Sequence, residues 1–212
     1  MRVRVKICGI TRPEDASAAA MAGADAIGLV FHPASPRHVT VERAREIVAA
    51  TPAFVTVTGL FLDPPERAVS ETLESVALDL LQFHGGESPA FCERFERRYL
   101  KAVPRDQATN APEWAQRYAS AAGLLFDSHT AGSAGGSGRT FDWSRLPREL
   151  SLPLILAGGL RPDNVGRAVR QVRPWGVDVS SGVEARTGVK DDTLMQRFVR
   201  EVQDQASDDY AQ

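Results

Sequence analysis

The feature that most constrains the fold is an alternation of short apolar runs with longer helical stretches, repeated eight times along the 212 residues. Short runs rich in β-branched residues, separated by helical patterns, predict strands of a parallel sheet. The predicted strands cover residues 3–7, 26–31, 54–61, 78–83, 99–103, 123–126, 154–156 and 176–179. The predicted helices cover residues 13–22, 41–50, 89–97, 111–119, 162–172 and 191–205, with another opening at Pro65 and a short one near Trp143.

Eight such units in one short chain favour a single-domain α/β fold, the (β/α)8 TIM barrel. A doubly wound open sheet is the alternative, and periodicity alone does not separate the two. The nearly continuous apolar runs at residues 26–31 and 78–83 suit strands that are buried on both faces. The glycine-rich stretch 133–138 lies inside one repeat and is expected to be a loop. We therefore expect a barrel over residues 1–205 and a frayed acidic tail at 206–212.

Composition and charge argue against nucleic acid and membranes as partners of this chain. The formal net charge of −2 implies no basic face for nucleic acid, and no apolar run approaches the roughly 20 residues of a membrane helix. The only cysteines are Cys8 and Cys92, so we expect no disulfide scaffold and a reducing, cytoplasmic setting. No cluster of histidine, cysteine and carboxylate has the spacing of metal ligands. The expected partner is a small molecule, and the chain is expected to be a monomer or a homodimer.

Polar residues stand where a barrel has its active site, at the carboxyl ends of the predicted strands. Cys8 is either a packed thiol or, if cations lower its pKa, a base; Lys6 should share its side of the strand. Asp127 is either a turn cap or a general acid. The first and sixth strands face each other across a ring of eight, which makes Cys8 and Asp127 a plausible base and acid. His84 is either a core histidine or a hydrogen-bonding group of the site.

Other loops suggest where anions would bind. Gly158 and Gly159 follow the seventh strand, and Ser180, Ser181 and Gly182 follow the eighth. Loops at these two positions commonly bind phosphate in barrels, through backbone N–H groups that glycine leaves accessible. Asp178 either pairs with a cation or binds a sugar hydroxyl. Arg37 lies in a proline-stiffened loop and is either a surface arginine or a bidentate clamp for a carboxylate.

From Lys6 to Asp191 the chain closely resembles the phosphoribosylanthranilate isomerases, a family of the tryptophan pathway. Any one of the shared motifs would be weak evidence, but their order and spacing together are highly specific. They are KICGIT from Lys6, SPR at residues 35–37, LQFHG from Leu81, FDS from Phe126, GGSGRTFDW from Gly135, LAGGLRPDNV from Leu156, GVDVSSGVE from Gly176 and GVKD from Gly188.

The resemblance implies an Amadori rearrangement of N-(5-phosphoribosyl)anthranilate to 1-(2-carboxyphenylamino)-1-deoxyribulose 5-phosphate, with no cofactor and no metal. It also implies that Asp127 is the general acid at the ribose ring oxygen and Cys8, as thiolate, the base at C2′. Arg37 matches the arginine that holds the anthranilate carboxylate. The glycines at 158 and 159 and the segment 178–182 match phosphate and ribose contacts.

The sequence departs from the family at a few positions and leaves two alternatives. Gly86 stands where an acidic or amide residue is frequent and Ala34 where lysine is frequent, so these two loops are less polar than usual; His32 stands where an aromatic is common. One alternative is a histidine-pathway or bifunctional aminoaldose isomerase, although that barrel uses an aspartate where Cys8 stands. The other is a phosphate-binding barrel without turnover.

Overall fold

The computed structural model describes residues 2–127, 142–147 and 149–208. Its parallel strands form a closed barrel in the order β1 to β8, completed by pairing of β1 with β8, in which Ile7 lies opposite Val179. This closure confirms the predicted barrel and excludes the open sheet. The strands are β1 (Arg4–Cys8), β2 (Ala26–Val30), β3 (Thr56–Phe61), β4 (Leu80–Phe83), β5 (Tyr99–Val103), β6 (Gly123–Phe126), β7 (Leu154–Leu156) and β8 (Gly176–Val179).

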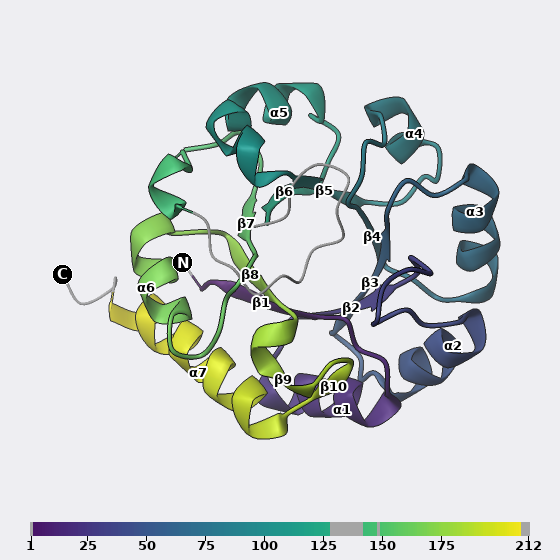
Figure 1. Ribbon diagram of the computed structural model, residues 1–212, viewed down its shortest axis with the longest axis horizontal. Coiled ribbons are helices and arrows are strands. Elements are labelled where there is room, and N and C mark those ends of the chain that lie inside the picture. Colours follow the sequence, from purple (N-terminus) through teal and green to yellow (C-terminus); the bar gives the residue numbers. More distant parts are fainter. Residues whose placement is uncertain (1, 128–141, 148, 209–212) are drawn as a thin grey trace.

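Helices form a ring around this barrel (Figure 1). They are α1 (Pro13–Ala22), α2 (Val41–Ala50), α3 (Glu66–Ser75), α4 (Pro89–Glu93), α5 (Ala111–Arg117), α6 (Val165–Val172) and α7 (Asp192–Asp208), with 3-10 turns η1 (Arg105–Asn110), η2 (Trp143–Arg145) and η3 (Ser181–Val183). The side chains of Thr40 and Ser88 cap α2 and α4 by accepting hydrogen bonds from backbone N–H groups of the first turn. Within the described ranges, no helix is both long and apolar enough to cross a membrane.

The core has two parts. The larger lies between the barrel and the helices. The smaller is inside the barrel and comes from the side formed by β5, β6 and β7; its members are Leu100, Ala102, Leu125, Ile155 and Ala157. The other strands carry buried polar side chains instead, including Lys6, Thr58, Gln82 and Asp178. The barrel interior is therefore apolar on one side and polar on the other.

Most predicted elements are confirmed to within two residues, and the differences have local causes. The helix predicted over 89–97 ends at Glu93, and Glu96 adopts φ 49° just before the chain enters β5. The helix predicted from Pro162 begins at Val165, because the side chain of Asn164 accepts a hydrogen bond from the Arg161 N–H and stabilises a turn there. The last helix continues to Asp208, and residues 209–212 lie outside the described residues.

The loops near β1 and β8 have two further features. Two residues before α1, the Thr11 hydroxyl donates to the carbonyl oxygen of Gly188, and α1 has no side-chain cap. A small antiparallel hairpin, β9 (Glu184–Arg186) and β10 (Val189–Lys190), follows β8 and was not predicted. Its strands are too short and too charged to show an alternating pattern.

Candidate active site

A cavity of about 80 Å³ lies at the carboxyl ends of the strands. It brings together six of the residues expected from the sequence, which are Cys8, Arg37, His84, Asp127, Asp178 and Ser180. The predicted base and acid therefore line one cavity, although they come from β1 and from the end of β6. The glycines at 158, 159 and 182 and Ser181 are not part of its lining. Ser128 and the motif from Gly135 lie largely outside the described residues.

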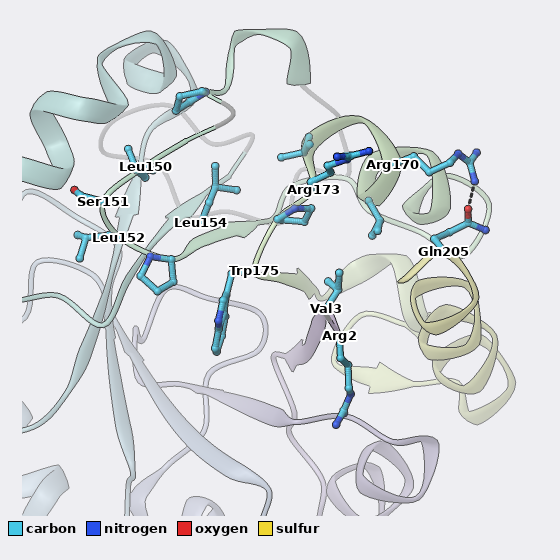
Figure 2. A pocket seen from close by; sticks show the side chains of 15 residues that line it. Arg2, Val3, Leu150, Ser151, Leu152, Leu154, Arg170, Arg173, Trp175 and Gln205 are labelled. Carbon is cyan, nitrogen blue, oxygen red and sulfur yellow. Dashed lines mark hydrogen bonds between the residues drawn. The ribbon is translucent and has the colours of Figure 1, made fainter. Parts of the chain in front are cut away.

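A larger cavity, of about 640 Å³, lies at the opposite end of the barrel (Figure 2). Arg2 and Val3 before β1, Leu154 at the start of β7 and Trp175 before β8 line it. Among its described lining residues the ionisable groups are arginines, so they offer no acid–base pair. Because barrel enzymes place their chemistry at the carboxyl ends of the strands, we assign the active site to the smaller cavity.

Cys8 lies beside a buried ion pair. The ammonium Nζ of Lys6 is 2.8 Å from Oδ1 of Asp178, and both side chains are almost inaccessible to solvent. Burial raises the pKa of the Cys8 thiol above its ordinary value, although the nearby Lys6 and Lys190 ammonium groups act in the opposite direction. Burial alone would lower the pKa of Lys6, but Asp178 and the Cys8 sulfur outweigh it and raise that pKa. The thiol form of Cys8 is therefore favoured, beside a lysine whose ammonium form is stabilised.

Asp127 contacts His84, in the loop after β4, and His84 in turn contacts Gln82 of β4. Nε2 of His84 is 3.4 Å from Oδ2 of Asp127, and Nδ1 of the same ring is 3.2 Å from the side-chain amide Nε2 of Gln82. All three residues are buried. Gln82 and His84 are two positions apart, so the alternation of a strand places both on the side that faces the barrel interior. Sequence reasoning found His84 and missed Gln82, although this spacing was available.

Arg37 is held by a carboxylate of the protein itself. Its Nε and Nη2 lie 2.7 and 2.8 Å from the two carboxylate oxygens of Glu184, which also contacts Nζ of Lys190 at 3.0 Å. Burial alone would raise the pKa of Glu184, but the Arg37 hydrogen bonds and the Lys190 ammonium lower it overall. One edge of the guanidinium is therefore occupied, and the N–H groups of its other edge have no hydrogen-bond partner among the described residues. Glu184 and Lys190 were not among the individual site residues predicted from the sequence.

The two loops expected to bind phosphate are in contact. Gly158 and Gly159 have φ values of 81° and 66°, which residues other than glycine rarely adopt. A Cβ on Gly182 would lie 1.9 Å from the carbonyl oxygen of Leu160, so the loop after β8 packs directly on the loop after β7. Lys190 reaches this region, because its Nζ donates to the carbonyl oxygen of Ser180 at 3.0 Å. The two loops therefore lie side by side, and phosphate binding by them stays a prediction.

A second buried network lies just outside the barrel, and the sequence analysis did not predict it. Lys101 of β5 is fully buried, and its Nζ donates to the carbonyl oxygens of Phe83 and Gly85 and to the carboxylate of Glu87. Glu87 in turn accepts hydrogen bonds from the N–H groups of Asp63 and Gly85. These bonds hold the backbone before and after His84, at Phe83 and at Gly85, in place. In the described part of the chain no three histidine, cysteine or acidic side chains group as metal ligands would.

Over most of its length the chain is similar to known proteins of one family. Residues 5–201 match the sequence model of the family described as N-(5'phosphoribosyl)anthranilate (PRA) isomerase. The N-(5'-phosphoribosyl)anthranilate isomerase of Stutzerimonas stutzeri is 56% identical over 200 residues, which cover 94% of this chain and 97% of that protein.

Solved structures give the same result. The phosphoribosyl anthranilate isomerase of Thermus thermophilus superposes with a TM-score of 0.84 at 36% identity, over 94% of this chain and 98% of that one. Another isomerase of this kind, solved in complex with reduced 1-(o-carboxyphenylamino)-1-deoxyribulose 5-phosphate, has a TM-score of 0.76 at 35% identity, with the same coverage. The match spans the barrel and all the loops that carry the site, and the chain belongs to the phosphoribosylanthranilate isomerase family.

Proposed function

We propose that this chain performs the reaction of its family, the Amadori rearrangement of N-(5'-phosphoribosyl)anthranilate in tryptophan biosynthesis, with Asp127 as general acid and Cys8 as base. The observation that carries the proposal is that both groups line one cavity, beside a guanidinium and next to two glycine- and serine-rich loops. One acid, one base, one carboxylate clamp and one phosphate anchor are what this substrate requires. The cytoplasmic setting and the monomeric or homodimeric state stay predictions from the sequence.

The first step opens the ribose ring. The carboxylic acid of Asp127 gives its proton to the ring oxygen while the bond from C1′ to that oxygen breaks and its electron pair goes to the oxygen. The nitrogen lone pair then forms a double bond to C1′, which gives an iminium ion. His84 supports this step, because an N–H facing Asp127 stabilises the carboxylate that remains after proton transfer.

In the second step the double bond moves from C1′ and nitrogen to C1′ and C2′. The Cys8 thiolate takes the proton from C2′, and the electron pair of that bond forms a double bond between C1′ and C2′ while the nitrogen becomes neutral. A proton then passes from the C2′ hydroxyl to C1′, which produces the ketone. Asp127 has lost a proton and Cys8 has gained one, so exchange with solvent restores both groups. No oxidant or reductant takes part.

Arg37 is assigned to the substrate carboxylate. The Nε–H group and one Nη2 hydrogen of Arg37 already donate to Glu184. The other edge of the guanidinium, formed by Nη1 and the second Nη2 hydrogen, can donate two parallel hydrogen bonds. The backbone N–H groups of the loops at 158–159 and 180–182 are assigned to the phosphate. Asp178 already binds Lys6 through one oxygen, which leaves its second oxygen for a ribose hydroxyl.

Single substitutions of the acid and the base test the proposal. Cys8→Ala and Asp127→Asn should each lower kcat by roughly 10²- to 10⁴-fold, as loss of a positioned acid or base does, while unfolding curves stay close to the parent. Loss of anthranilate-ester fluorescence measures turnover. Cys92→Ala is the matched control, because Cys92 is buried in α4 and lines no part of this cavity. Near-parental kcat in either test variant would overturn that assignment, and no turnover in the parent would favour a binding protein.

A further inference from the structure

Gln82 is a buried amide with an unused acceptor. It is fully buried in β4, it lines the active-site cavity, and its Oε1 has no hydrogen-bond partner among the described residues. Buried polar atoms in native proteins are nearly always paired, because an unpaired one loses its hydration without compensation. An unpaired oxygen at the wall of a ligand cavity therefore indicates a donor that arrives with the ligand.

The orientation of the amide follows from its neighbours. Nε2 of His84 lies 3.4 Å from Oδ2 of Asp127, so when Asp127 is ionised, as it is after its proton transfer, a neutral ring has its proton on Nε2 and Nδ1 is an acceptor. Nδ1 is 3.2 Å from the Gln82 amide, and only the NH₂ group of that amide can donate to it. The Oε1 atom must then point away from the ring. The same contact that fixes the histidine tautomer leaves the oxygen available.

We propose that Gln82 is a positioning and specificity residue of the isomerase site: its NH₂ group holds His84 in the Nε2–H tautomer that supports Asp127, and its Oε1 accepts a hydrogen bond from a ribosyl hydroxyl of the substrate. The inference rests on the proposed role of Asp127 as the acid. A neutral Nε2–H donor stabilises the newly formed Asp127 carboxylate and needs no proton of its own. The opposite tautomer would present a lone pair to that carboxylate and repel it.

The chain supplies a matched control for this amide. Thr58 on the neighbouring strand β3 is also fully buried and also has an unpaired side-chain oxygen among the described residues, but it does not line the cavity. Thr58→Val therefore removes a buried unpaired oxygen without touching the site. Two test variants separate the roles of the amide. Gln82→Met keeps the length and removes the donor and the acceptor, and Gln82→Glu keeps acceptors and removes the donor.

The tautomer is read by ¹⁵N NMR of the imidazole rings at neutral pH. The chain has four histidines, and His84→Gln assigns the signal. We expect the Nε2–H tautomer in the parent and in Thr58→Val, a mixture of tautomers in Gln82→Met, and a proton on Nδ1 in Gln82→Glu. Loss of folding alone would not move the proton in this way, and thermal unfolding identifies variants that do not fold. An unchanged Nε2–H signal in Gln82→Glu overturns the positioning role.

Binding tests the free oxygen. Reduced 1-(o-carboxyphenylamino)-1-deoxyribulose 5-phosphate is the probe, and calorimetric titration gives its Kd. One lost hydrogen bond corresponds to a Kd about tenfold weaker in Gln82→Met, whereas Thr58→Val should match the parent. Equal affinity in Gln82→Met and the parent overturns the acceptor role. If Asp127→Asn keeps its activity, the assignment of Asp127 as the acid, on which this inference rests, fails. If Asp127→Asn is inactive while both Gln82 variants behave as the parent, only this inference fails.

Discussion

Single side chains set the chemistry of the site, and Cys8 shows how strongly burial acts. The thiol was a candidate from its position alone, but no sequence pattern reports how much solvent it loses. Burial raises its pKa, and the ammonium of Lys6 only partly offsets this effect. The protonated thiol is therefore favoured, and Cys8 must lose its proton before it can act as the base.

This leads to a prediction about thiol reactivity. In a Cys92→Ala variant Cys8 is the single cysteine, so iodoacetamide reports on it alone. The alkylation rate should stay low at neutral pH and rise only above the ordinary thiol pKa of about 8.5, as followed by mass spectrometry. A rate that reaches half its maximum below about pH 8 would show that the thiolate already exists in the free protein. Lys6→Met should move the rise to still higher pH.

Glu184 allows a prediction about pH at the same scale. Its pKa is lowered in the folded protein, so its contribution to stability is complete above the ordinary glutamate pKa of about 4.3 and is lost as the pH falls through the lowered value. Glu184→Gln should reduce the free energy of unfolding by on the order of 1–3 kcal/mol at pH 7. Urea unfolding should show this difference shrinking below about pH 4. A difference that is constant from pH 7 to pH 3 would contradict the ion pair with Arg37.

At the scale of elements, the sequence predicts most strands and helices because apolar runs and helical periods repeat so regularly. It fails where a polar side chain changes the backbone, as Asn164 does before α6, and where an element is too short for a pattern, as in β9 and β10. The network that fixes the loop between β4 and α4 was invisible for a related reason. Lys101 lies on the outer side of an apolar strand, and its partners Gly85 and Glu87 come from the loop between β4 and α4, 16 and 14 residues earlier in the chain.

The third prediction concerns this network. Lys101→Met removes the cation from a Glu87 carboxylate that is 2% exposed, and breaking such a buried pair costs about 3–5 kcal/mol. Urea unfolding measures the loss, and Lys101→Met/Glu87→Gln should recover part of it because no buried charge is then left alone. Strict additivity of the two substitutions would contradict the coupling. Lys101 and Glu87 hold the loop between β4 and α4, which starts at the site residue His84. The kcat of Lys101→Met should therefore also fall.

At the scale of the whole molecule, the number of repeated units favoured a closed barrel, but periodicity alone did not separate it from an open sheet. The reason is physical: closure depends on pairing between the first and last strands, which no local pattern records. At the seam, by which we mean the pairing of β1 with β8 that closes the barrel, the structure adds an ion pair. Lys6 of β1 and Asp178 of β8 are 172 residues apart in the sequence. This ion pair also lies directly beside Cys8, so stability and chemistry meet where the barrel closes.

The seam provides the last prediction. Lys6→Met leaves the Asp178 carboxylate buried without its cation, at a cost of about 3–5 kcal/mol. Because β1 and β8 belong to one closed barrel, this loss should lower the stability of the entire domain. Far-UV circular dichroism and tryptophan fluorescence, which reports Trp114, Trp143 and Trp175, should then shift to lower urea together. A fluorescence transition that precedes the loss of helix would mean that the part near β8 unfolds alone, and the chain would not behave as the single domain predicted for residues 1–205.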